Sequence, residues 1–370
     1  MTGSPLRVLV VEDSITIRRY IVRVLEANGM EVVGEAADGL SATQMCKALQ
    51  PDMVTMDMIL PGLSGLAATE QIMAFCPTPI LIVSASVNRG EVFQTYEALA
   101  AGAVDVFDKV RSGEITSEWE TRFVAAVRMT ARIKVITHPR ARLSQGRAFQ
   151  PAMDETANGT TSPSDMQADL IALGASTGGP AAIAEILRKL PAGFPIPILI
   201  VLHISELFAF AFAEWLNTLS PIPARYAQDG ELLPRPGKPQ IILAPAGRHM
   251  VVESGMLRLR DSPERNSCRP SIDVLFESIA RHEPLRASLL LLTGMGKDGA
   301  QGLLAGRQAG LDTIAQDEAS SVIFGMPAEA IRLGAVKRVL PLQEIAPNLM
   351  ELANLSKAGV NRMRGARTSP

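Results

Sequence analysis

Apolar and polar residues are arranged in two long blocks, each with the pattern of repeated strand and helix units. In the first block, residues 5–135, five short apolar runs are separated by segments with apolar residues at helical spacing. Runs that are apolar throughout indicate strands of a parallel sheet that is covered on both faces. The predicted strands are Leu6–Val11, Glu31–Gly34, Met53–Met56, Pro79–Val83 and Ala103–Phe107.

The second block, residues 169–356, has the same kind of pattern without repeating the first in sequence. A hairpin is expected around Glu253–Gly255, where a glycine follows a serine between two apolar runs. The predicted strands are Leu170–Leu173, Ile196–Leu202, Gln240–Leu243, Ala287–Leu292 and Thr313–Ala315. The predicted helices are Pro180–Leu190, Ser205–Leu219, Ser271–Arg281, Gly299–Gln308 and Met326–Leu333.

Two segments lack this periodicity. Residues 136–168 contain prolines among Ser, Thr, Asn and Gly and are predicted to be a linker. Residues 357–370 form a polar, basic tail. The fold class predicted from these patterns is α/β, with two doubly wound parallel-sheet domains: a five-stranded domain and a Rossmann-like second domain.

Bulk composition narrows the class of protein. The 370 residues are 47% hydrophobic and 20% charged, and the net charge of −2 gives no reason to expect binding to nucleic acid. Three cysteines, an odd number, favour reduced thiols and a cytoplasmic location over a disulfide framework. No apolar run approaches the roughly 18–20 residues of a membrane span, so direct membrane insertion is not expected.

Polar residues follow the strands of the first domain, at the edge where an open parallel sheet binds ligands. Glu12 and Asp13 follow the first strand, and Asp57 follows the third. Three carboxylates at one site repel one another unless a cation lies among them, and Mg²⁺ prefers such oxygen ligands. A carboxylate beside that ion can attack a phosphoryl group, which makes Asp57 the phosphorylation candidate. Lys109 and Ser84 are placed to contact the phosphoryl oxygens.

The second domain places a serine at the mouth of a strand-to-helix unit. Ser176 lies in the segment Gly174–Pro180, His203 ends the next apolar strand, and Asp298 lies in a glycine-rich turn after another. At the carboxyl ends of strands they could meet as nucleophile, general base and orienting acid. The glycines of the turn leave the backbone amide of Met295 accessible as an oxyanion donor. No cofactor is expected for ester hydrolysis.

Two other folds fit the serine segment less well. The α/β-hydrolase order is serine, acid and then histidine, whereas here His203 precedes Asp298 and no histidine follows. The glycines of Gly174–Gly179 match neither the phosphate-binding loop ending in Gly-Lys-Ser/Thr nor the G-x-G-x-x-G dinucleotide pattern.

Residues 5–135 resemble the receiver domain of response regulators, which implies phosphorylation of Asp57 by a histidine kinase. The second block, 169–356, resembles the catalytic domain of the chemotaxis protein-glutamate methylesterase (CheB) family. This resemblance rests on Ser176, His203 and Asp298 in their motifs, and on the segments Arg269–Phe276 and Ala315–Pro327. It implies hydrolysis of glutamate γ-methyl esters, and deamidation of certain glutamines, on the cytoplasmic helices of methylated chemoreceptors. Some members of the family carry histidine at the position of Cys268, whose role stays open, and we interpret His249 as structural.

The leading hypothesis is a phosphorylation-activated methylesterase that serves sensory adaptation. In this hypothesis the first domain covers the Ser176 cleft, and an acyl phosphate on Asp57 loosens that packing. The alternative is a phosphorylation-dependent binding or scaffold protein in a chemosensory-like pathway, without turnover. A third interpretation keeps the chemistry but places the receptor in a pathway other than swimming.

Overall fold

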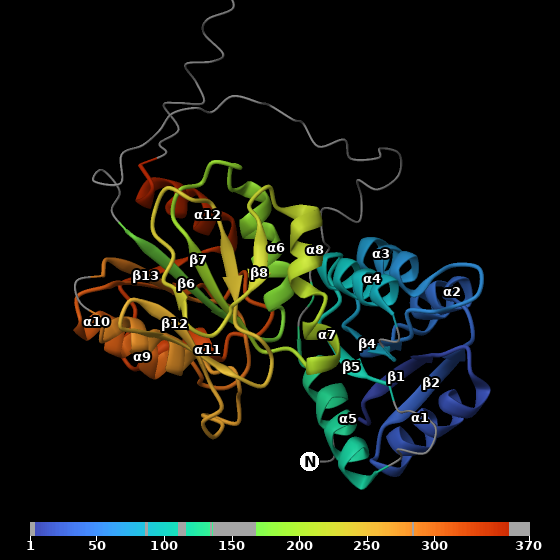
Figure 1. The fold of residues 1–370 in the computed structure, drawn as a ribbon. Helices are drawn as coiled ribbons and strands as arrows, with labels where there is room; N and C mark the ends of the chain where they lie inside the picture. The colour runs from blue at the N-terminus through green and yellow to red at the C-terminus, as the bar shows by residue number, and fades with distance from the viewer. Residues whose placement is uncertain are drawn as a thin grey trace, which may run out of the picture. The chain divides into compact units, whose positions relative to one another are not determined.

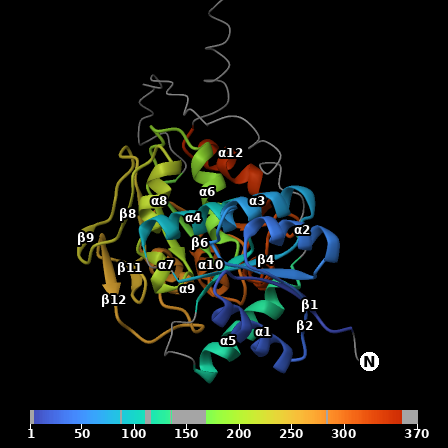
Figure 2. The ribbon, with the colours of Figure 1, turned by 90° about the vertical axis from the view of Figure 1, so that its right-hand side faces the viewer.

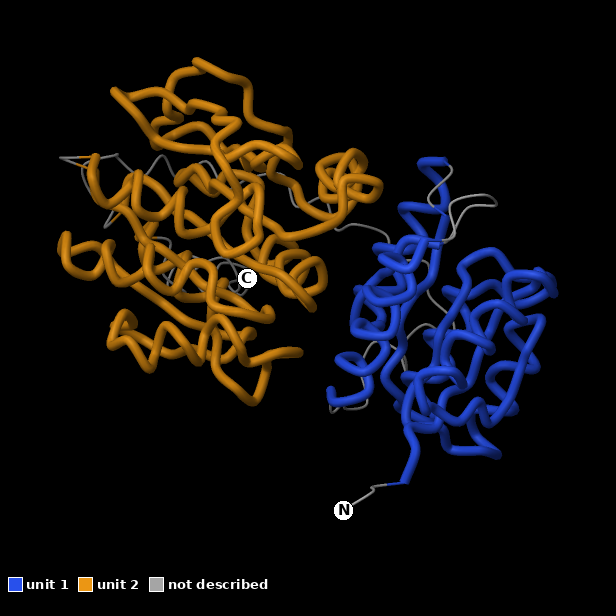
Figure 3. Tube along the Cα trace, turned by 90° about the horizontal axis from the view of Figure 1, so that it is seen from below, with its two compact units in different colours: residues 1–152 blue, residues 153–370 orange. Residues whose placement is uncertain are grey.

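The described part of the chain lies in two compact units, residues 1–152 and 153–370 (Figure 3). The division falls inside the predicted linker, 136–168. That linker lies outside the described residues except for Ala168, and the predicted tail, 357–370, lies wholly outside them. The computed structural model describes residues 4–85, 88–109, 116–133, 135, 168–282 and 285–354.

The first unit contains a five-stranded parallel sheet in the order β2-β1-β3-β4-β5. Its central strands are almost fully buried, which agrees with their uniformly apolar sequences. All five strands lie where the sequence predicts them, within two residues. Their bounds are β1 Arg7–Val11, β2 Glu31–Ala36, β3 Met53–Met56, β4 Ile80–Ser84 and β5 Asp105–Asp108.

Helices cover both faces of this sheet, with α1 and α5 on one face and α2, α3 and α4 on the other (Figure 1). Most of them begin at a polar residue whose side chain accepts a hydrogen bond from a first-turn amide, as Asp38 does from the Ser41 amide at 2.8 Å. The bounds are α1 Ile15–Ala27, α2 Gly39–Leu49, α3 Gly65–Phe75, α4 Arg89–Ala100 and α5 Ser117–Thr130.

The second unit contains a seven-stranded parallel sheet in the order β15-β14-β13-β6-β7-β10-β8. From β6 the chain builds the sheet first toward β8 and then, from β13, toward β15. The strand order therefore reverses between β6 and β13, and ligands of such sheets bind at the carboxyl ends of the strands beside this switch point. The bounds are β6 Leu170–Ala175, β7 Ile198–Leu202, β8 Ala224–Tyr226, β10 Ile241–Leu243, β13 Ala287–Leu291, β14 Asp312–Gln316 and β15 Arg338–Leu340.

Helices α6, α8 and α12 cover one face of this sheet, and α9, α10 and α11 cover the other (Figure 1). A small antiparallel sheet, β11-β12-β9, lies at one side of the unit (Figure 2). Its strands are β9 Glu231–Leu232, β11 His249–Glu253 and β12 Met256–Arg260. The helices are α6 Gly179–Lys189, α7 Glu206–Ala209, α8 Phe212–Leu219, α9 Ile272–Ala280, α10 Ala300–Gln308, α11 Met326–Arg332 and α12 Leu342–Leu352.

These two parallel sheets with helices on both faces confirm the predicted fold class. The predicted hairpin is also present, as β11 and β12 joined through Ser254 and Gly255, both with positive φ. No helix in the described part of the chain is both long and apolar enough to cross a membrane.

One predicted helix is wrong in its extent. Residues 205–219 form two helices, α7 and α8, with a break at Phe210 and Ala211. The Tyr226 hydroxyl donates a hydrogen bond to the Ala209 carbonyl, which diverts that carbonyl from the helical ladder. The sequence patterns also do not predict β8, β9, β15 and α12.

The aromatic core of the first unit generates a stability prediction. Phe123 is fully buried on α5 and stacks on Trp119, with ring centroids 4.8 Å apart. Phe123→Ala should reduce the free energy of unfolding of this unit by about 3–5 kcal/mol, because it removes this packing and leaves a cavity. The measurement is urea unfolding followed by Trp119 fluorescence in a Trp215→Phe background, since the chain has only these two tryptophans.

The matched control is Phe75→Ala in the same unit and the same background. Phe75 is 67% exposed, so this change should alter the free energy of unfolding by no more than about 0.5 kcal/mol. Equal effects of the two substitutions would contradict the packing assigned to Phe123.

Candidate active site

Three neighbouring strands bring the predicted catalytic residues to one edge of the second sheet. Ala175 of β6 is paired with Leu202 of β7, so Ser176 and His203 are the next residues in register. The His203 amide donates to the Ala175 carbonyl at 2.9 Å. Asp298 lies in the loop between β13 and α10, on the other side of β6. All three residues therefore flank the switch point of the sheet.

Two glycines allow the loops at this edge to approach one another. Gly178 has φ +77°, and a Cβ there would lie 2.6 Å from Val322 side-chain atoms. A Cβ at Gly294 would lie 2.7 Å from the Cβ of Ser176. The Ser176 amide donates to the Thr293 carbonyl at 3.0 Å, which fixes the serine backbone beside the loop that carries Asp298. Larger residues at the two glycines would push these loops apart.

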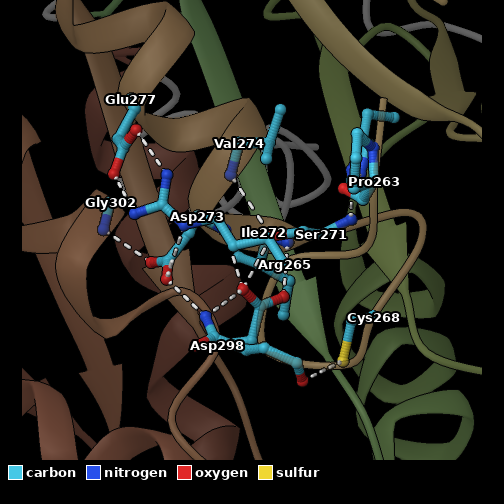
Figure 4. Close-up of polar contacts among 12 residues, drawn as sticks. Pro263, Arg265, Cys268, Ser271, Ile272, Asp273, Val274, Glu277, Asp298 and Gly302 are labelled. Carbon is cyan, nitrogen blue, oxygen red and sulfur yellow. Dashed lines mark hydrogen bonds and ion pairs between the residues drawn. The ribbon is translucent and has the colours of Figure 1, made fainter. Parts of the chain in front are cut away.

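Asp298 is almost completely buried, and its carboxylate is the centre of a hydrogen-bond network (Figure 4). His203 Nε2 lies 3.0 Å from Asp298 Oδ2. The other donors are the Ser271 hydroxyl at 2.7 Å, the Ile272 amide at 2.7 Å, the Asp273 amide at 3.3 Å and the Asn266 side-chain amide at 3.2 Å.

The N-terminus of α9 contributes much of this network. Ser271 is the N-cap of α9, and the amides of Ile272 and Asp273 are first-turn groups that lack partners within the helix. Their partial positive charge favours an anion at this position. Burial raises the pKa of Asp298, but the hydrogen bonds from His203, Ser271 and Ile272 outweigh it and lower the pKa below its usual value. Asp298 therefore stays ionised.

His203 faces two partners. With Asp298 ionised, Nε2 carries the proton of the 3.0 Å hydrogen bond, and Nδ1 lies 3.7 Å from Cys268 Sγ. Burial lowers the pKa of His203, but the hydrogen bond to Asp298 and the neighbouring Cys268 outweigh it and raise the pKa to about 9. The histidine is therefore held as part of an ion pair at neutral pH.

The backbone of Ser176 lies next to that of His203, at the ends of two paired strands. Among the described residues, however, no hydrogen bond joins the Ser176 hydroxyl to the His203 imidazole. The structure thus brings His203 and Asp298 together and leaves the last contact of the predicted triad open. Hydrogen bonds between catalytic groups are often long without substrate and tighten when it binds.

Met295 lies in the loop before Asp298, with its side chain 56% exposed. Gly294 and Gly296 flank it, and the Gly294 amide donates to the Ile323 carbonyl at 3.0 Å. Within the described residues the Met295 amide donates no backbone hydrogen bond, which suits a donor that is free for an oxyanion. A cavity of about 810 Å³ opens beside this loop and is lined in part by Cys268, Met295 and Asp298.

The sequence patterns did not show that Ser271, Ile272, Asp273 and Asn266 hold Asp298, although the segment Arg269–Phe276, singled out above, contains three of them. From the sequence, His249 is interpreted as structural, and the contacts of this residue agree with that interpretation. This residue is fully buried, its Nδ1 accepts from the Ser271 amide at 3.1 Å, and its Nε2 lies 3.1 Å from the Pro263 carbonyl. Both ring nitrogens are thus used in holding the start of α9.

The first unit carries a second polar cluster at the carboxyl edge of its sheet. Glu12, Asp13 and Asp57 offer ligand oxygens that all lie within 4.8 Å of one another. Lys109 Nζ lies 2.9 Å from Glu12 Oε2 and 2.8 Å from Asp57 Oδ2. Ser84 ends β4 and is buried. All five predicted residues therefore lie at this edge.

The electrostatics of this cluster fit a cation. Burial and the Asp57 carboxylate raise the pKa of Glu12 to about 7. Burial also raises the pKa of Asp57 in spite of the ion pair with Lys109. Carboxylates that resist ionisation beside a single lysine are stabilised by a further positive charge. The donor set, all carboxylate oxygen, is one that hard divalent ions prefer.

These features define a response regulator joined to a hydrolase. Two family models match the chain: CheB methylesterase over residues 171–349, and response regulator receiver domain over residues 8–117. The second match implies a divalent-metal site in the first unit.

Full-length relatives identify the family. A protein-glutamate methylesterase/protein-glutamine glutaminase of Anaeromyxobacter dehalogenans is 42% identical over 349 residues, which cover 94% of this chain and 97% of that protein. One of Geobacter metallireducens is 41% identical over 353 residues, which cover 94% and 99%. The chain belongs to the protein-glutamate methylesterase/protein-glutamine glutaminase family. A solved structure, the CheB methylesterase catalytic domain of Thermotoga maritima, is 33% identical and covers 50% of this chain and 98% of that one, with a TM-score of 0.47.

The His203–Asp298 pair leads to a pH prediction. The His203 imidazole should titrate with a pKa of about 9 in NMR spectra, and Asp298→Asn should lower that pKa, because the carboxylate is lost while the burial remains. The signal is assigned by its absence in His203→Gln. The folded-state pKa exceeds the ordinary 6.5, so the stabilisation of the fold is complete below pH 6.5 and is lost as the pH rises through about 9. A midpoint at or below 6.5 would contradict the ion pair.

Proposed function

We propose that this protein hydrolyses glutamate γ-methyl esters, and deamidates glutamines, on the cytoplasmic helices of chemoreceptors. The observation that supports this most directly is the His203–Asp298 pair at the switch point of the sheet, with Ser176 next in register. The names of its relatives state the same two reactions. Nothing among these relatives favours the alternative of a scaffold without turnover.

In the proposed reaction the Ser176 oxygen attacks the ester carbonyl while Nδ1 of the neutral form of His203, the minor form at neutral pH because the resting pKa is about 9, takes the hydroxyl proton. Asp298 holds the Nε2–H and stabilises the imidazolium that forms. The Met295 amide donates to the oxygen that becomes negative. The imidazolium then gives its proton to the methoxide oxygen, which leaves as methanol, or to the amide nitrogen of a glutamine, which leaves as ammonia. Water activated by His203 finally releases the glutamate and restores Ser176.

Regulation is assigned to the first unit. A histidine kinase supplies the phosphoryl group, and the Asp57 carboxylate accepts it as an acyl phosphate. Glu12, Asp13 and Asp57 would hold Mg²⁺, which neutralises charge on the phosphoryl oxygens. Lys109, already 2.8 Å from Asp57, and the Ser84 hydroxyl bond the oxygens of the phosphorylated form. Phosphorylation then raises the rate of ester hydrolysis in the second unit.

The nucleophile is tested by Ser176→Ala. Methanol release from methylated receptor membranes should fall by on the order of 10⁶-fold, because no other group replaces the attacking oxygen. Ser262→Ala, an exposed serine of the same unit, serves as the control and should keep the full rate. Unchanged methanol release by Ser176→Ala would remove this residue from the mechanism.

The switch is tested by Asp57→Asn. A small-molecule phosphodonor with Mg²⁺ should raise the wild-type rate by roughly 5–150-fold, the usual range of coupling between two sites, and leave the Asp57→Asn rate unchanged. Asp52→Asn is the matched control, because Asp52 lies at the opposite end of β3 and its contact with the Arg7 amide needs only a carbonyl-type oxygen. An equal response of Asp57→Asn and wild type would refute this regulation.

A further inference from the structure

Cys268 occupies the position beside His203 that the proposed mechanism needs for the serine. Its sulfur lies 3.7 Å from His203 Nδ1, whereas among the described residues the Ser176 hydroxyl makes no bond to that nitrogen. The thiol also lies 3.4 Å from the Asn266 carbonyl. On the other side of the imidazole, the Asp298 carboxylate lies 3.0 Å from His203 Nε2. Three different ligand types, imidazole, thiol and carboxylate, therefore meet at one place.

The spacing of these groups suits a metal ion of the zinc type. His203, Cys268 and Asp298 offer ligand atoms that all lie within 4.8 Å of one another. Two ligands of a tetrahedral Zn²⁺, with bonds of about 2.3 Å to sulfur and 2.0 Å to nitrogen, lie roughly 3.5 Å apart. The observed 3.7 Å between Sγ and Nδ1 is close to that separation. A zinc ion fits with only a small adjustment of the two side chains.

The residue that would hold the histidine ligand in position, Asp298, already contacts it. Asp298 accepts from His203 Nε2 at 3.0 Å, which holds the imidazole with Nδ1 toward the thiol. Such a carboxylate–histidine pair orients the imidazole in most histidine–metal sites. Asp298 is itself held by Ser271 and Ile272, both at 2.7 Å, so the pair is rigid.

An ion can reach the site from solvent. Cys268 is partly exposed, and it lines the cavity of about 810 Å³ together with Met295 and Lys297. The cavity also leaves room for the waters that complete a tetrahedral shell. The other two cysteines, Cys46 and Cys76, belong to the first unit and have no part in this site.

We propose that Cys268 Sγ and His203 Nδ1 bind Zn²⁺, or a similar thiophilic divalent ion, and that this ion inhibits the esterase reversibly. The thiol and Nδ1 of the imidazolium each release a proton to solvent, and the sulfur and the nitrogen each form a bond to the metal, with no change in oxidation state. The imidazole nitrogen that would accept the Ser176 proton is then occupied. The inhibitory effect rests on the proposed function, but metal binding does not.

Binding is measured on the full chain with Co²⁺ as a spectroscopic probe, in excess Mg²⁺ so that the carboxylates of the first unit are occupied. Wild type should show the thiolate-to-cobalt charge-transfer band, and Zn²⁺ should remove it by competition. Cys268→Ser should lose the band. The double variant Cys46→Ser, Cys76→Ser should keep it, and Cys76→Ser alone repeats this control if the double variant does not fold.

Inhibition is measured as ester hydrolysis against Zn²⁺ concentration, each protein relative to its own zinc-free rate, with recovery by a chelator. The Zn²⁺ concentration for half inhibition should rise about tenfold or more in Cys268→Ser. A band that persists in Cys268→Ser, no band in wild type, or equal zinc sensitivity would each overturn the proposal. A band that depends on Cys268 in a chain without esterase activity would instead refute the proposed function and leave the metal site standing.

Discussion

The second unit is organised around one buried anion, the carboxylate of Asp298. Burial alone would favour its neutral form, and an isolated buried carboxylate is strongly destabilising. Here the first-turn amides of α9, the Ser271 hydroxyl and His203 donate to it. These donors keep the carboxylate ionised, and the ionised carboxylate in turn holds the imidazole. The same contact therefore stabilises the fold and, in the proposed mechanism, orients the base.

The topology explains why this anion lies beside the serine. Because the strand order reverses between β6 and β13, the loops after these strands leave from the edge at which such a sheet binds ligands. Gly178 and Gly294 then let the loops approach to distances that no Cβ would permit. A residue from β13's loop and a residue from β6's loop can thus act on one substrate group, although they are far apart in sequence.

Sequence patterns predicted the positions of Ser176, His203 and Asp298 because each follows an apolar run, and strand ends are readable from such runs. They did not predict that Ser271 and Asn266 contact Asp298, because that depends on where the start of α9 packs against a distant loop. Nor could they predict the side-chain torsions that direct His203 Nδ1 to Cys268 and leave the Ser176 hydroxyl, among the described residues, without a hydrogen bond to His203. Short elements such as β8, only three residues long, carry too little periodicity to detect.

The two candidate sites hold their carboxylates in opposite ways, and the difference fits their proposed tasks. Asp298 has four kinds of donor around it and a lowered pKa, so its charge is constant and serves to orient His203. Glu12 and Asp57 have mainly Lys109 as a donor, and burial raises the pKa of both. A site whose negative charge is incompletely compensated responds strongly when a cation arrives or a phosphoryl group changes its charge. The site proposed to switch is therefore the one with the poorly compensated carboxylates, and the site proposed to catalyse is the one in which the charge of Asp298 is fixed.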